Sequence, residues 1–155
     1  MRLADARTLA ILVTSNNVDL AYARLAAARA SGRDVKAFAR RMTQEHTSLN
    51  SALNFLALRL DIAPREDEIS RVLRDQSATR RDSLRTFTGR RFDSAYVANE
   101  VRYHEELLVA IDRVFLPSAQ RPEIREFVTN LRPTISAHLA HAEQLQAALT
   151  TAAPR

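Results

Sequence analysis

The stretch DVKAFARRMTQEHTSLNSALNFLALRL, residues 34–60, decides the fold because its apolar residues recur with a helical period and a histidine interrupts their line. The residues at exact heptad spacing are Val35, Met42, Leu49 and Leu56. His46 lies one turn from Met42 and one from Leu49, so its ring is expected to point into a core. A buried imidazole needs a partner for each nitrogen. What His46 meets is therefore the central question of this chain.

The composition predicts an all-α protein. Only two glycines and five prolines occur in 155 residues, and Ala, Leu, Arg and Glu are abundant, as is typical of helices. Cysteine is absent, which excludes disulfides and thiolate metal sites. The length fits one domain over residues 1–155.

The net charge of +5 comes mostly from arginines that are spread among acidic residues, which favours solvated helix faces. We therefore expect no nucleic-acid binding. The first apolar run, residues 9–13, is too short for a signal peptide or a membrane span, and we expect neither in these residues. The partners are unknown, and the sequence leaves the oligomeric state open, a homodimer included.

Four long helices and one connecting helix are predicted. The long helices are expected at about 5–31, 34–61, 91–116 and 122–149, and the connecting helix at about 65–85. Ser31 and Gly32 end the first helix and Asp34 is expected to cap the second, which makes the pair an antiparallel hairpin. Few apolar residues line one face of the connecting helix. Together these elements predict a four-helix bundle with a long helical crossover between the second and third long helices.

Each long helix places one residue with metal-binding chemistry on its apolar line. These residues are Asp19, His46, His104 and His138. Asp19 precedes Gly32 by 13 residues and His46 follows it by 14, so both are expected at the same height in the bundle.

The second pair is expected to match less well. Counted from the loop after Pro117, His104 lies about one turn closer to the loop than His138, whereas Glu100 is level with His138. Glu100 and Glu45 are therefore reserve ligands, or partners that orient a histidine ring through its other nitrogen. His141, nearer the edge of the apolar line, is a further reserve ligand.

Three imidazoles and a carboxylate can fill a tetrahedral site for a divalent ion, with zinc favoured over iron or manganese. One alternative is a metal-free structural or interaction module, in which the same groups form a buried polar network. A second alternative is an iron or manganese redox protein. Di-iron bundles use Glu-x-x-His pairs, and no histidine of this chain completes one. No catalytic residue is assigned, and non-catalytic binding is favoured over an enzyme activity.

Three segments of the sequence resemble a bacterial family. They are DVKAFARRMTQEH (34–46), GRRFDSAYVANEVRYHEELL (89–108) and LRPTISAHLAHAEQL (131–145), joined by Asn16 and Asp19. The family is the exported ferritin-like domain-of-unknown-function family 4142, whose members are often labelled outer-membrane proteins. The resemblance implies a ferritin-like bundle and export to the periplasm, with the cytoplasm as the alternative location. It brings no established reaction, and the family usually carries glutamate where this chain has Asp19.

Overall fold

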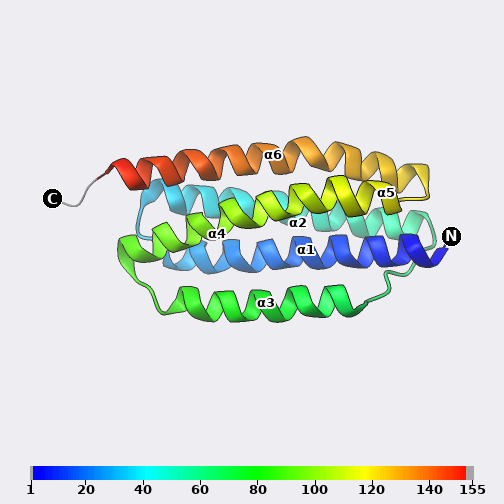
Figure 1. The fold of residues 1–155 in the computed structure, drawn as a ribbon, viewed down its shortest axis with the longest axis horizontal. Helices are drawn as coiled ribbons and strands as arrows, with labels where there is room; N and C mark the ends of the chain where they lie inside the picture. The colour runs from blue at the N-terminus through cyan, green and yellow to red at the C-terminus, as the bar shows by residue number, and fades with distance from the viewer. Residues whose placement is uncertain (1, 153–155) are drawn as a thin grey trace.

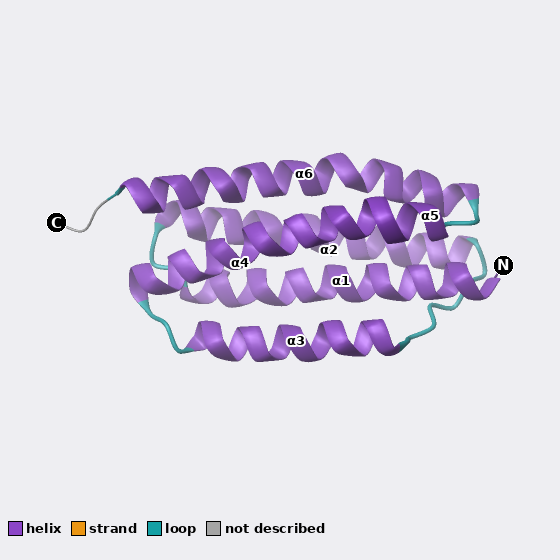
Figure 2. Cartoon of the chain, viewed as in Figure 1, coloured by secondary structure: helices purple, strands orange, loops and turns teal. Residues whose placement is uncertain are grey.

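The computed structural model describes residues 2–152, with side chains for residues 4–152. The described part of the chain is helical and contains no strand, which confirms the predicted all-α class (Figure 2). The elements are α1 (Arg2–Arg29), α2 (Arg33–Arg59), α3 (Glu68–Arg85), α4 (Gly89–Ala110), the π-helical turn η1 (Ile111–Phe115), α5 (Leu116–Ser118) and α6 (Pro122–Thr151). No helix within residues 2–152 has the length and apolar character needed to cross a membrane.

The helices α1, α2, α4 and α6 lie side by side with their long axes roughly parallel (Figure 1). The closest packing is between α1 and α2 and between α4 and α6, and contacts of α1 with α4 and of α2 with α6 join the two pairs. Helix α3 packs against α1 and α4. This arrangement creates one elongated core between the helices.

The line of residues that carries Asp19 along the first helix is buried. Its buried members are Leu9, Leu12, Asn16, Asp19, Ala23, Ala26 and Ala30. Alanines favour a helix and also allow a neighbouring helix to approach closely, as α2 does here. The same line carries Asn16 and Asp19 into the core, where polar groups need partners or ligands.

Asp93 of α4 holds the turn between α1 and α2. Its carboxylate accepts hydrogen bonds from the Ser31 backbone N–H (2.9 Å), the Ser31 hydroxyl (2.9 Å) and the Gly32 backbone N–H (2.7 Å). The expectation that Asp34 caps the second helix is wrong, because α2 begins at Arg33 and no side chain caps it. The cap residue is Gly32, and the carboxylate that serves the turn comes from α4.

Both ends of α3 are tied to α1. At its start, Asp67 accepts a hydrogen bond from the Ser70 backbone N–H at 3.0 Å and forms an ion pair with Arg7 at 2.9 Å. At its end, the Arg29 guanidinium donates to the carbonyl oxygen of Arg85 at 3.1 Å. These contacts fix the position of α3 on the outside of α1.

The helical path of α4 continues past its predicted end at Leu116. After the wider turn η1, the short helix α5 reaches Ser118 and includes Pro117. Pro117 is the second residue of α5 and has no backbone N–H to donate.

Candidate metal centre

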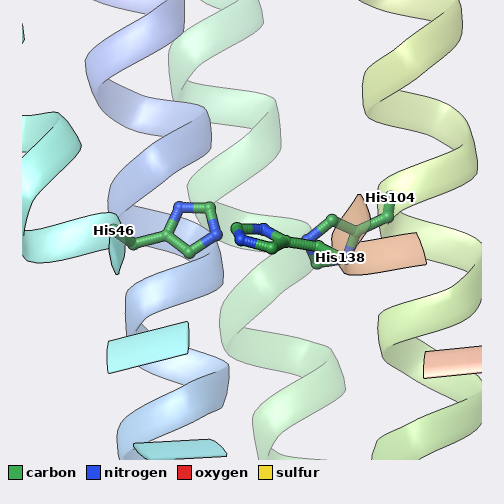
Figure 3. A group of neighbouring side chains, drawn as sticks. All are labelled: His46, His104 and His138. Atoms are coloured by element: carbon green, nitrogen blue, oxygen red, sulfur yellow. The ribbon is translucent and has the colours of Figure 1, made fainter. Parts of the chain in front are cut away.

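The rings of His46, His104 and His138 converge from α2, α4 and α6, and all three side chains are buried (Figure 3). The ring centroids are 6.1 Å apart for His46 and His104, 5.2 Å for His46 and His138, and 5.4 Å for His104 and His138. Each residue offers one ring nitrogen such that the three nitrogens lie within 4.8 Å of one another. Ligand atoms bonded to one tetrahedral zinc ion at about 2.0 to 2.2 Å lie about 3.3 to 3.6 Å apart, so nitrogens within 4.8 Å of one another can reach a single ion after a small inward movement of the rings.

The expectation that His104 and His138 match poorly is wrong for their rings, whose centroids lie 5.4 Å apart. The error has a physical reason. Side chains on a helix lean toward its N-terminus, so on antiparallel α4 and α6 the His104 ring leans away from the connecting loop and the His138 ring leans toward it. These opposite side-chain directions bring the two rings together, although their backbone positions differ by about one turn when counted from the loop.

Asn16 fixes the proton position on His46. The Asn16 side-chain amide donates to the backbone carbonyl of His46 at 2.7 Å, which turns its oxygen toward the ring. That oxygen lies 2.5 Å from His46 Nδ1 and can only accept, so Nδ1 carries the proton. The other nitrogen, Nε2, then faces the cluster.

His104 has the same arrangement with a different acceptor. Its Nδ1 lies 2.9 Å from the backbone carbonyl oxygen of Glu100, one turn earlier on α4, and donates to it. His104 Nε2 is buried and has no hydrogen-bond partner within the described part of the chain. A ligating nitrogen with the opposite N–H held by a protein oxygen is the usual state of a metal-bound histidine.

His138 faces the cluster through its other nitrogen. Its Nε2 contacts the Glu45 carboxylate on α2, and its Nδ1 is buried without a hydrogen-bond partner among the described residues. Burial would raise the pKa of Glu45, but the Arg41 guanidinium, at 2.7 Å, and His138 hold it below its usual value. Glu45 is therefore a carboxylate that accepts the Nε2 proton and leaves Nδ1 as the free nitrogen.

Two fully buried carboxylates lie beside the histidines. Asp19 Oδ2 on α1 contacts His46 Nε2 and lies 3.4 Å from His104 Nε2. Glu100 on α4 forms a second group with Asp19 and His104, again with one ligand atom from each within 4.8 Å of the others. Within residues 4–152, no group donates a hydrogen bond of acceptable geometry to either carboxyl group, although Asp19 is in contact with His46.

Burial and mutual charge shift the pKa values of these groups in different directions. Burial favours a raised pKa for Asp19, but the adjacent His46 and His104 outweigh it and hold the pKa well below the usual range. Burial raises the pKa of Glu100 well above its usual value, and the charge of Asp19 raises it further. Burial lowers the pKa of His104, and lowers that of His138 to about 4. His104 and His138 are therefore neutral at pH 7, which is the form that binds a metal ion.

The structure brings together the predicted ligands Asp19, His46, His104 and His138 and the reserve residue Glu100. Glu45 lies outside this cluster and contacts His138 through the ring nitrogen that faces away from it. His141 takes no part in either group of ligand atoms that the described residues form. Its Nδ1 accepts from Arg41 at 3.1 Å, and its ring packs edge-on against Phe38. Glu100 was identifiable from its position one turn before His104 on the same face of the helix.

One comparison with known proteins gives a match. A family model described as "Domain of unknown function (DUF4142)" matches residues 1–145. No curated protein and no solved structure matches the chain. The matched range contains every residue of the candidate centre.

Proposed function

The chain belongs to this family of domains of unknown function, and we propose that it binds a divalent metal ion in its helical core, with zinc favoured over iron and manganese. We assign the ligands as His46 Nε2, His104 Nε2 and His138 Nδ1, with Asp19 as the fourth. We take the fold to be a ferritin-like four-helix bundle of α1, α2, α4 and α6, in which α3 is the crossover.

The observation that carries this proposal is the direction of the hydrogen bonds. Each of the three rings donates its outward N–H to a protein oxygen and turns its other nitrogen, which has no hydrogen-bond partner among the described residues, toward the cluster. The inward atoms of Asp19 and Glu100 are also oxygens without a donor among the described residues. Acceptors that face one another repel unless a cation or protons lie between them. A divalent cation removes this repulsion because it binds several of these atoms at once.

A metal-free polar network is the second candidate, and the pKa shifts support it. Burial opposes charge on His46, but Asp19 raises the pKa of its imidazole. A proton on His46 and another on Glu100 would supply donors to the cluster. The two candidates differ in one measurable property, because only the first predicts a bound metal.

Metal analysis of protein purified without chelator tests the proposal. We expect at least one equivalent of metal per chain after zinc loading, and a melting temperature that falls on chelation and recovers with zinc. Zinc at about 100 times its Kd adds about 2.7 kcal/mol, which for a domain of this size is roughly 5 to 10 °C. Less than about a tenth of an equivalent after loading, with an unchanged melting temperature, would favour the metal-free network.

The choice of metal needs a separate measurement. Iron and manganese are redox-active and zinc is not, so anaerobic ferrous loading followed by exposure to oxygen separates the two classes. We expect no visible absorption band and no oxygen consumption beyond that of free ferrous ion. A band that forms only in the protein sample would assign the centre to iron.

A further inference from the structure

The cluster contains more inward ligand atoms than one tetrahedral ion uses. The buried atoms without a hydrogen-bond partner among the described residues are His46 Nε2, His104 Nε2, His138 Nδ1, both oxygens of Asp19 and both oxygens of Glu100. Three histidines and Asp19 already complete a four-coordinate zinc site. Such a site would leave both oxygens of Glu100 buried beside Asp19 without a ligand or a hydrogen-bond partner among the described residues.

These donors fall into two overlapping sets. One set joins the three histidines, and the other joins Asp19, Glu100 and His104. Within residues 4–152 the two sets share only His104. Two positions for cations, side by side, explain this division more simply than one.

Asp19 lies where a bridging ligand is required. Its Oδ2 contacts His46 and lies 3.4 Å from His104, and its two oxygens are both free of other hydrogen bonds in the described chain. A carboxylate with two free oxygens can bind one ion through each, and paired ions in proteins lie about 3.5 to 4 Å apart.

We propose that the centre holds two divalent ions bridged by Asp19, an inference that rests on the proposed metal binding and extends it. The first ion takes His46 Nε2 and His138 Nδ1, and the second takes His104 Nε2 and Glu100. Each ion also takes one oxygen of Asp19. Two divalent ions outweigh these two carboxylates in charge, so anionic oxygen ligands such as hydroxide complete the remaining coordination positions.

The two positions differ in chemistry. The first has two nitrogen ligands and suits zinc, whereas the second has one nitrogen and carboxylate oxygens and suits a harder ion such as Mn²⁺. A centre that holds one zinc and one manganese ion is therefore expected when both metals are supplied.

Metal stoichiometry of the full chain tests this inference. Equilibrium dialysis against Zn²⁺ plus Mn²⁺ is followed by elemental analysis of the wild type, Glu100→Gln and the control Glu105→Gln. Glu105 is the exposed glutamate next to His104, so its substitution changes the same charge without touching the cluster. We expect two ions per chain in the wild type and in the control. Glu100→Gln should retain zinc and lose manganese.

Each other outcome decides a separate point. One ion per wild-type chain at saturation overturns the paired centre but leaves the proposed metal binding intact. Two ions in Glu100→Gln overturn the assignment of Glu100 to the second ion. No ion in any sample contradicts the proposed function itself. If Glu100→Gln does not fold, the wild-type stoichiometry still decides between one ion and two.

Discussion

Asn16 forms two hydrogen bonds with His46. Its side-chain oxygen accepts one from the ring Nδ1–H at 2.5 Å, and its side-chain amide donates the other to the His46 backbone carbonyl at 2.7 Å. Both contacts cross from α1 to α2 and are buried. They fix the rotation of the ring and the nitrogen that faces the cluster. Asn16 is therefore a positioning residue for His46.

Replacement of Asn16 by alanine should weaken zinc binding about 10- to 100-fold, because the ring loses the group that orients it. The variant should also lose roughly 1 to 3 kcal/mol of stability, since the freed Nδ1–H and carbonyl are buried. Competition with a zinc indicator measures the affinity, and Asn17→Ala is the control. Asn17 is exposed and pairs with Asn50, so its loss should leave zinc affinity unchanged. Equal affinities in the two variants would remove Asn16 from the centre.

Replacement of His138 by leucine should abolish or strongly reduce the zinc-dependent rise in melting temperature. The metal-free variant should be as stable as the wild type or more stable at pH 7, because a buried nitrogen without a partner is exchanged for an apolar group of similar size. Glu45 loses its contact with the ring but keeps Arg41 and remains partly exposed. His141→Leu is the control, and it should respond to zinc like the wild type. A wild-type response in His138→Leu would exclude His138 as a ligand.

The metal-free protein should lose stability as the pH falls below about 6.5. Burial lowers the pKa of His138 to about 4 in the folded state, whereas the unfolded chain takes up this proton near pH 6.5. Between these values the unfolded state binds more protons, so the free energy of unfolding falls with pH by up to about 1.4 kcal/mol per unit. The effect of His46, whose pKa is raised, lies above pH 6.5, but Glu100, whose pKa is raised well above its usual value, acts in the opposite direction below it, so the comparison is with His138→Leu. Urea unfolding in chelator at several pH values should give a shallower dependence for the variant, and parallel curves would contradict the shift.

Replacement of Asp93 by alanine should destabilise the protein by roughly 3 kcal/mol, because three hydrogen bonds to the α1–α2 turn are lost together. Urea unfolding measures the loss, and Asp75→Ala at an exposed position of α3 is the control. Gly32→Ala should act in the same direction, since its Cβ would lie 2.9 Å from Asp93 Oδ2 and displace the carboxylate. Zinc stoichiometry should stay unchanged in the folded fraction. An Asp93→Ala protein as stable as Asp75→Ala would show that the turn does not need this carboxylate.

The helical class was predictable because periodicity reports burial directly. A residue on the apolar line of a helix is expected to be buried even when the helix that packs against it is unknown. The three buried histidines were predicted in this way. The shape of the loop between α4 and α6 was not predictable, since the wide turn η1 depends on packing rather than on a local motif. The single domain, the cellular location and the oligomeric state stay predictions.

The identity of the site residues was predictable and their relative heights were not. Counting residues from a loop locates backbone positions, whereas ligand atoms lie at the ends of side chains that lean in opposite directions on antiparallel helices. That error left Glu100 as a reserve ligand, although Glu100 and His104 lie in one group of candidate ligand atoms. The role of Asn16 needed the structure, because its contact with His46 joins side chains from different helices.

Complete enclosure of the histidines and Asp19 would also govern how a bound ion exchanges. An ion at this depth can leave only when helices part or side chains rotate, so release is governed by opening of the protein and not by bond strength alone. Metal captured while the chain folds would then persist through purification. An ion found in freshly isolated protein would therefore reflect the metals present when the chain folded, whereas removing and reloading it in vitro would measure the intrinsic preference of the site.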